Sequence, residues 1–139
     1  MSAICITTTT NTIEKFEENR SVLKIHNKQK LPLSRRQVDG CLITKGIKCD
    51  WMLVEEESKT EIYIELKGSD VEHAVDQICK TAETLSSSPR RKWGYVICTR
   101  SPMSATEIQR ATKTVAKSHG IMLRIRKTVH EESIENLIA

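Results

Sequence analysis

Aromatic residues are scarce in this chain, and no part of it is apolar for long. Phe, Trp and Tyr make up 4% of the 139 residues, while Gly and Pro contribute only 5 and 3 residues. So few Gly and Pro residues exclude a collagen-like or linker-like chain, and without a run of about 18 to 20 apolar residues no membrane span is expected. The remaining composition, 38% hydrophobic and 29% charged, is typical of a globular protein. The length predicts a single domain, residues 1–139.

Cysteine pairs at metal-ligand spacing are also absent. The 5 cysteines include no Cys-x-x-Cys motif, and their odd number is typical of neither a disulfide framework nor a closed zinc site. We therefore expect small apolar thiols in a reducing compartment. The first residues lack the basic end and apolar stretch of a signal peptide, which favours a cytoplasmic location. The cysteines are Cys5, Cys41, Cys49, Cys79 and Cys98.

Five short segments have the alternating or continuously apolar pattern of β-strands. The second and third of them are separated only by the polar residues 55–59, which predicts that these two strands form a hairpin. The third strand is followed by Gly68, which would end it. The expected strands cover residues 38–44, 50–54, 60–66, 93–99 and 121–127.

Four helices are expected around these strands, each after a segment with the pattern of an N-terminal cap. Gly120 would close the third helix in a left-handed conformation. The element order, α-β-β-β-α-β-α-β-α, predicts an α/β fold in which a mixed sheet of about five strands is flanked by helices. The capping segments are 11–14, 69–72, 104–107 and 128–131, and the helices cover 15–25, 71–85, 105–119 and a short C-terminal segment.

An acid and a lysine stand two positions apart in the third expected strand. Because side chains alternate along a strand, Glu65 and Lys67 would share one face. Asp50 begins the preceding strand, and hairpin pairing would bring its carboxylate close to Glu65. Two carboxylates without an obligatory histidine suit Mg²⁺, and the lysine would orient or deprotonate a water, or neutralise charge on a phosphate. This pattern predicts a metal-dependent phosphodiesterase site.

The acid-x-Lys triplet is by itself a weak signal, because about one is expected by chance in a chain of this length. A second triplet, Glu57-Ser58-Lys59, falls in a polar turn where an exposed ion pair explains it. The context distinguishes the first triplet: its strand ends in Gly, an acid lies on the preceding strand and a capped helix follows. Asp39, in the expected strand 38–44, is the alternative to Asp50 if the strand count is off by one, so that this strand rather than 50–54 carries the acid that partners Glu65.

This constellation resembles the PD-(D/E)XK nuclease superfamily, which includes restriction-endonuclease-like and Holliday-junction-resolvase-like proteins. The likeness covers about residues 13–100 and combines an α-β-β-β-α-β order with Asp50, fourteen intervening residues and then Glu65-Leu66-Lys67. It implies that Asp50 and Glu65 bind Mg²⁺, for which Mn²⁺ would substitute, and that Lys67 assists the attack of water on a DNA phosphodiester. Cys49 stands where the motif commonly has Pro.

The same resemblance suggests two further catalytic residues. Gln77 matches a Gln that some branches place on the helix after the third strand, although Thr81 stands where the best-known version has Tyr. The segment Phe16-Glu17-Glu18 is similar to the Phe-Glu that opens the first helix of restriction-type relatives. Glu17 is therefore the expected additional acid.

Basic residues supply the expected contacts with DNA. The net charge of +4 permits a polyanionic partner without requiring one. Arg110, Lys113 and Lys117 would form a stripe on the helix 105–119, although a solvated helix face also explains such a stripe. Few aromatic residues favour contact with duplex DNA over stacking on single strands. The other expected contacts are Arg35, Arg36, Arg90 and Arg91.

The leading hypothesis is a small Mg²⁺-dependent DNA endonuclease. A homodimer is expected, because cutting both strands of a duplex or both arms of a branched junction takes two sites. Restriction or host defence and junction processing both fit this hypothesis. The alternative is a non-catalytic nuclease-like domain that binds nucleic acid or a protein partner. The presence of Asp50, Glu65 and Lys67 together favours the enzyme, since decay of the site would remove one of them.

Overall fold

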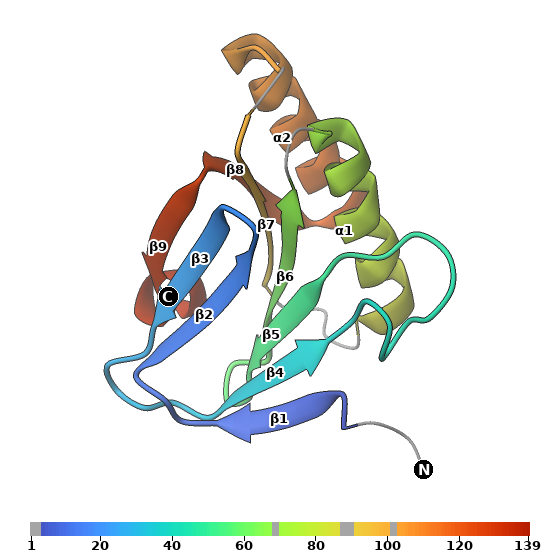
Figure 1. Cartoon of the computed structure of the whole chain (residues 1–139). Helices are drawn as coiled ribbons and strands as arrows, with labels where there is room; N and C mark the ends of the chain where they lie inside the picture. Colours follow the sequence, from blue (N-terminus) through green and yellow to red (C-terminus); the bar gives the residue numbers. More distant parts are fainter. Residues whose placement is uncertain (1–3, 68–69, 87–90, 101–102) are drawn as a thin grey trace.

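A mixed sheet of six strands forms the centre of the molecule (Figure 1). The computed structural model describes residues 4–67, 70–86, 91–100 and 103–139, without the Lys67 side chain. In sheet order the strands are β1 (Ile6–Thr9), β4 (Leu33–Gln37), β5 (Trp51–Glu55), β6 (Thr60–Lys67), β7 (Lys92–Cys98) and β8 (Ile121–Lys127). Strands β1, β4, β5 and β6 pair antiparallel, whereas β6–β7 and β7–β8 pair parallel.

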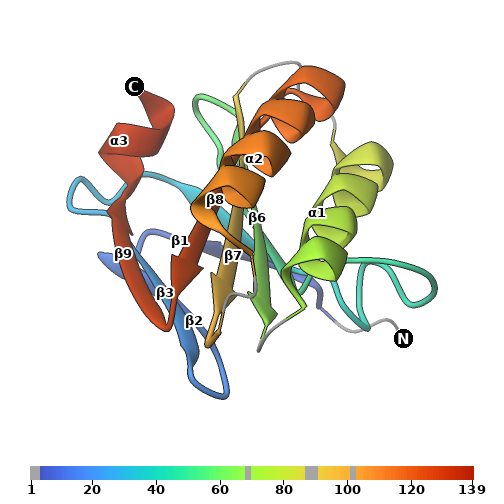
Figure 2. The same ribbon diagram turned by 90° about the horizontal axis from the view of Figure 1, so that it is seen from above.

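Two helices, α1 (Val71–Leu85) and α2 (Ala105–His119), connect the parallel strands and cover one face of this sheet (Figure 2). The Ser104–Glu107 capping box and the left-handed Gly120 after α2 are confirmed. The N-cap of α1 is Asp70 rather than the predicted Ser69, and its carboxylate accepts the His73 N–H at 3.1 Å. Among the described residues, no helix has both the length and the apolar character needed to cross a membrane.

The opposite face is covered by a second sheet, which was not predicted. It has three strands, β2 (Ile13–Glu18), β3 (Ser21–His26) and β9 (Val129–Ser133), and the short helix α3 (Ile134–Ile138) follows β9. Phe16, Leu23 and Ile25 pack from this sheet into a core with Ile62 and Ile64 of β6. The α/β class and the mixed sheet flanked by helices are therefore confirmed, but one flank consists mainly of strands.

The predicted helix at residues 15–25 is wrong, because these residues form the β2–β3 hairpin. Glu14 and Phe16 are buried while Lys15 and Glu17 are exposed, which is the alternation of a strand rather than of a helix. Asn19 takes the left-handed conformation at φ 55°, which a tight turn tolerates and a helix does not.

Two other segments also differ from expectation. Residues 38–44 were predicted to be a strand but form turns with one isolated bridge, and the strand β4 precedes them. Gly40 at φ 75° breaks the extended backbone there. Residues 129–133 are strand β9, parallel to β3, so the final helix is shorter than predicted. Helix α3 is held against the main sheet by Trp93 of β7, whose indole N–H donates to the Leu137 carbonyl at 2.9 Å.

Arg35 joins the two sheets. Its guanidinium lies 4.0 Å from the ring centroid of Phe16 and 4.5 Å from that of Trp51, and it donates to the Glu14 carboxylate at 3.2 Å. Glu14 is only 4% exposed and also accepts a hydrogen bond from the Thr9 hydroxyl. Stacking between two aromatic rings and pairing with a buried acid are contacts that the planar, always charged guanidinium is suited to make. Arg35 is thus a structural residue of the interface between the sheets.

We predict that Arg35→Ala lowers the free energy of unfolding by roughly 2–4 kcal/mol, because it removes the stacking and leaves the buried Glu14 carboxylate without its cation. The control is Arg36→Ala. Arg36 pairs at 3.6 Å with Glu56, whose side chain is 33% exposed against 5% for Glu14, so its loss should cost at most about 1 kcal/mol. Urea unfolding of both variants measures the difference, and equal losses would contradict the structural role of Arg35.

Cys5 and Cys41 form a disulfide across 36 residues of chain, which corrects the expectation that all five cysteines are free thiols. The other three, Cys49, Cys79 and Cys98, are free and buried. The disulfide connects the residue before β1 to the turns that follow β4. It therefore ties the outermost strand of the main sheet to the loop that leads into β5.

Reduction of the Cys5–Cys41 disulfide should lower the free energy of unfolding by about 3–4 kcal/mol. This is the loss expected from chain entropy when a disulfide closes a loop of 36 residues. Urea unfolding with and without dithiothreitol measures the change. The double variant Cys5→Ser/Cys41→Ser should show the same loss and no response to dithiothreitol. A wild-type midpoint that does not move on reduction would be inconsistent with this bridge.

Candidate active site

Asp50 and Glu65 lie close together at one end of the β5–β6 hairpin. The last pair of the ladder sets Trp51 opposite Ile64, Asp50 immediately precedes Trp51, and Glu65 immediately follows Ile64. The Asp50 N–H donates to the Ile64 carbonyl at 3.1 Å, and its carboxylate Oδ2 accepts the Leu66 N–H at 2.8 Å. Both carboxylates lie near the thiol of Cys49, whose pKa each of them raises. The hairpin thus brings the two predicted carboxylates together.

The possible ligands at this site are the carboxylate oxygens rather than the sulfur of the neighbouring Cys49. Glu65 is 1% exposed, while Asp50 is only partly buried, so the pair is reached from the side of Asp50. The neighbouring Cys49 is fully buried. Burial raises the pKa of its thiol to about 12, and the nearby Glu65 and Asp50 carboxylates contribute to the rise. Cys49 is therefore a neutral thiol at physiological pH rather than a nucleophile or a thiolate ligand.

Two side chains of α1 hold the segment that leads into β5. The Gln77 amide donates to the Lys48 carbonyl at 2.9 Å. The Thr81 hydroxyl accepts the buried Cys49 N–H at 2.8 Å and donates to the Gln77 carbonyl at 2.7 Å. Gln77 and Thr81 are one helical turn apart, so they hydrogen-bond to the backbone of the two consecutive residues before Asp50, the Lys48 carbonyl and the Cys49 N–H. The Gln77 Oε1 atom is buried and has no hydrogen-bond partner within the described part of the chain.

Thr81 is a site residue that sequence reasoning missed. It was noted only as a departure from the Gln-x-x-x-Tyr pattern of the resembling family. Its position four residues after Gln77, on the buried face of α1, was the available signal. The hydroxyl positions the strand that carries Asp50 and does not itself face the carboxylate pair through any described contact.

Lys67 and the alternative acids are placed as follows. Lys67 ends β6, where its backbone pairs with Cys98, and its side chain is not among the described parts. Glu17 lies on the exposed face of β2 and pairs with Lys15 at 3.1 Å, so the structure does not bring it to Asp50 and Glu65. Asp39 lies in a turn, is 59% exposed and pairs with Lys48 at 3.8 Å.

The donor chemistry of the pair fits a hard divalent cation. No group of three or more His, Cys, Asp or Glu side chains with metal-binding geometry occurs among the described residues. Mg²⁺ does not require one, because it is usually held by one or two carboxylates and keeps several waters. Asp50 and Glu65 supply two such carboxylates, one of them close to the molecular surface.

The predicted DNA contacts fall into two groups. Arg110, Lys113 and Lys117 are exposed along α2. The opposite side of α2, with Ile108 and Val115, packs on the core. Arg91 is also exposed, just before β7, and Arg90 lies outside the described residues.

The other two predicted contacts are engaged within the molecule. Arg35 is stacked and paired between the sheets, as described above. Arg36 donates to the Ser34 hydroxyl at 2.9 Å and pairs with Glu56. Neither guanidinium is free to meet a phosphate without losing contacts of its own.

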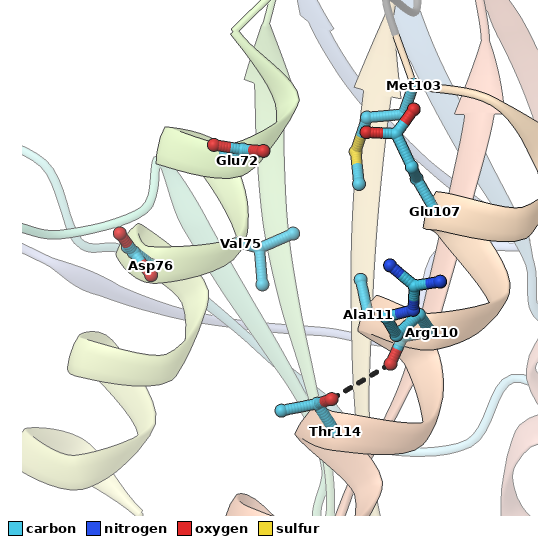
Figure 3. A pocket seen from close by; sticks show the side chains of 8 residues that line it. All are labelled: Glu72, Val75, Asp76, Met103, Glu107, Arg110, Ala111 and Thr114. Carbon is cyan, nitrogen blue, oxygen red and sulfur yellow. Dashed lines mark hydrogen bonds between the residues drawn. The ribbon is translucent and has the colours of Figure 1, made fainter.

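A cleft of about 390 Å³ lies between α1 and α2 (Figure 3). Val75 and Ala111 lie between the two helices, and among the described residues that line the cleft Arg110 alone is basic. It contains neither Asp50 nor Glu65. Its three acids, with a single arginine, make it a poor environment for a phosphate. These acids are Glu72, Asp76 and Glu107.

We predict that Thr81→Val lowers the free energy of unfolding by about 1–3 kcal/mol, because the buried Cys49 N–H loses its acceptor. Thr84→Val is the matched control. The exposed Thr84 hydroxyl donates to the Lys80 carbonyl at 3.0 Å but accepts no buried N–H, so its loss should change stability by less than about 0.5 kcal/mol. Chemical denaturation tests both variants, and similar effects would argue against the role of Thr81.

Comparison of the chain with protein-family models, with curated proteins and with solved structures finds no significant match. The assignment of a function therefore rests on the geometry of the site.

Proposed function

We propose that the protein is a metal-dependent endonuclease that hydrolyses DNA phosphodiester bonds. The observation that supports the proposal is the closeness of Asp50 and Glu65 at the end of the hairpin, with the Asp50 carboxylate bound to the Leu66 amide and both carboxylates near Cys49. Two carboxylates of the kind that a hard cation prefers would then lie near Lys67, the last residue of β6. An isolated surface salt bridge would not explain a glutamate that is 1% exposed close to a second carboxylate.

The order of elements supports a restriction-endonuclease-like core. Strands β4, β5 and β6 pair antiparallel, α1 follows, and β7 returns parallel to β6. This is the β-β-β-α-β part of the PD-(D/E)XK pattern. The β2–β3 hairpin occupies the place in the chain where that pattern has its first helix. We propose that the core is a variant of the family fold with this substitution.

Each residue has a defined part in the proposed reaction. Asp50 and Glu65 would hold Mg²⁺ or Mn²⁺, which supplies charge neutralisation and Lewis acidity to the phosphodiester. Lys67 would hydrogen-bond the attacking water and the phosphoryl oxygens. In hydrolysis, a bond forms between the water oxygen and phosphorus while one ester P–O bond breaks. Gln77 acts as a positioning residue, because it holds the peptide group two residues before Asp50.

The proposed substrate is duplex or branched DNA, and the proposed active form is a homodimer. The exposed stripe on α2 supports contact with a phosphate backbone, which requires charge but no base recognition. Two sites are needed to cut both strands of a duplex or both arms of a junction. Restriction or host defence and junction processing differ in the substrate that they prefer.

We predict that the wild type cleaves DNA with Mg²⁺ and not with EDTA, and that Glu65→Gln and Lys67→Ala each reduce the rate at least about 100-fold, since each removes a group that acts on the reacting phosphate. The chain offers a matched control in its second triplet. Glu57→Gln and Lys59→Ala change the same residue types in an exposed turn and should leave the rate within about twofold. Supercoiled, linear and four-way-junction DNA are the substrates.

Two results would overturn the proposal. If Glu65→Gln and Lys67→Ala cleave as fast as the wild type, the activity comes from another site or a contaminant. If all folded variants and the wild type are inert while still binding DNA or a protein, the chain is a binding domain with a nuclease-like fold. A circular dichroism spectrum of each variant shows that loss of activity is not loss of fold.

A further inference from the structure

A second cleft, of about 500 Å³, opens at the C-terminal ends of the neighbouring strands β6 and β7. Leu66 and Thr99 contribute from the ends of these strands, and the β2–β3 turn forms the opposite wall. The described residues that line it include two arginines and one acid, in contrast to the acid-rich cleft between the helices. These charged residues are Glu18, Arg20 and Arg100.

Arg20 and Arg100 are available for an external ligand. Both are exposed, and neither makes a hydrogen bond or ion pair with another residue of the described chain. They differ in this from Arg35 and Arg36, whose guanidinium groups have partners within the molecule. Arg20 and Arg100 come from segments 80 residues apart in sequence, which the fold brings to one cleft. Two guanidinium groups lining one concave surface are a typical arrangement for binding phosphate.

The cleft adjoins the carboxylate pair through Leu66. The Leu66 N–H binds the Asp50 carboxylate at 2.8 Å, while the Leu66 side chain lines the cleft. Successive side chains of a strand point to opposite faces of its sheet. Glu65 therefore faces α1, and Leu66 faces the second sheet, at the same strand end. A DNA backbone that crosses this end of β6 would meet the carboxylates on one side and the arginines on the other.

We propose that Arg20 and Arg100 bind a backbone phosphate of duplex DNA next to the phosphodiester that is positioned at Asp50 and Glu65. The inference deepens the proposed function and rests on it for the identity of the substrate. The contact is with phosphate, so it adds affinity and sets the path of the strand without reading sequence. The β2–β3 turn is thereby a DNA-binding element, because it carries Arg20.

Removing the charge of Glu18 should change DNA affinity in the direction opposite to removing an arginine. Its carboxylate lines the same cleft and repels a phosphate bound there. Glu18→Gln should therefore tighten DNA binding, roughly three- to fivefold, while Arg20→Gln and Arg100→Gln should each weaken it roughly five- to tenfold. Opposite effects from neighbouring side chains are not expected from a general loss of structure.

The experiment measures binding of a fluorescent duplex in EDTA, where cleavage cannot occur, at several salt concentrations. Each arginine variant should reduce the slope of log affinity against log salt by about 1, because one phosphate contact is lost. Lys28→Gln is the control for charge alone. Lys28 is exposed and follows β3 at the end opposite to Arg20, so its variant should retain the wild-type slope.

The outcomes separate this inference from the proposed function. Weaker DNA binding by both arginine variants and tighter binding by Glu18→Gln would support phosphate binding in the cleft, whether or not the wild type cleaves DNA. If the wild type cleaves DNA through Glu65 and Lys67 but the arginine variants bind and cleave normally, the proposed function stands and the cleft is not a phosphate site. If Lys28→Gln has the same effect as Arg20→Gln, general charge explains the binding and the inference is overturned.

Discussion

The register of β5 against β6 is the constraint on which the candidate site depends. A slip of one residue between these strands would turn the side chains of β5 to the other face and would move Asp50 away from Glu65. The Asp50 carboxylate opposes such a slip because it accepts the Leu66 amide. Thr81 adds a second restraint from α1 by binding the Cys49 amide. The acid that we propose as a metal ligand is therefore also part of the structure that positions it.

The carboxyl ends of the parallel strands concentrate functional groups at one edge of the sheet. Strand β6 ends there between two layers, with α1 on one face and the β2–β3 hairpin on the other. Open α/β sheets commonly bind ligands outside the carboxyl ends of their strands, where loops and helix N-termini meet. Gly94 of β7 helps α1 to pack closely on this sheet, because a Cβ atom there would lie 3.0 Å from Ile78. Close packing keeps Gln77 and Thr81 within reach of the segment before β5.

The predictable elements are those whose signals are local. Strand β6, helix α1 and helix α2 follow from alternation, helical periodicity and caps, and the closeness of Asp50 and Glu65 follows from the short hairpin between β5 and β6. The β2–β3 hairpin and β4 were missed because their stability comes from distant partners. Glu14 had the spacing of a capping acid, yet it is buried against Arg35, twenty-one positions away. Thr81 was missed for the same reason, since its partner Cys49 precedes it by 32 residues.

Arginine shows why counting charges along a chain does not locate a binding surface. Arg35 belongs to a basic pair in sequence, but its guanidinium is enclosed by two aromatic rings and a carboxylate from other segments. Arg20 and Arg100 come from segments 80 residues apart, yet both line one cleft, and neither has a hydrogen-bond or ion-pair partner in the described part of the chain. A cation whose charge is already compensated gains little by meeting a phosphate, because it must first give up its own contacts. The cations best able to bind a phosphate are therefore those without a partner among the described residues, and two of these, Arg20 and Arg100, line a cleft at the end of the strand that carries Glu65.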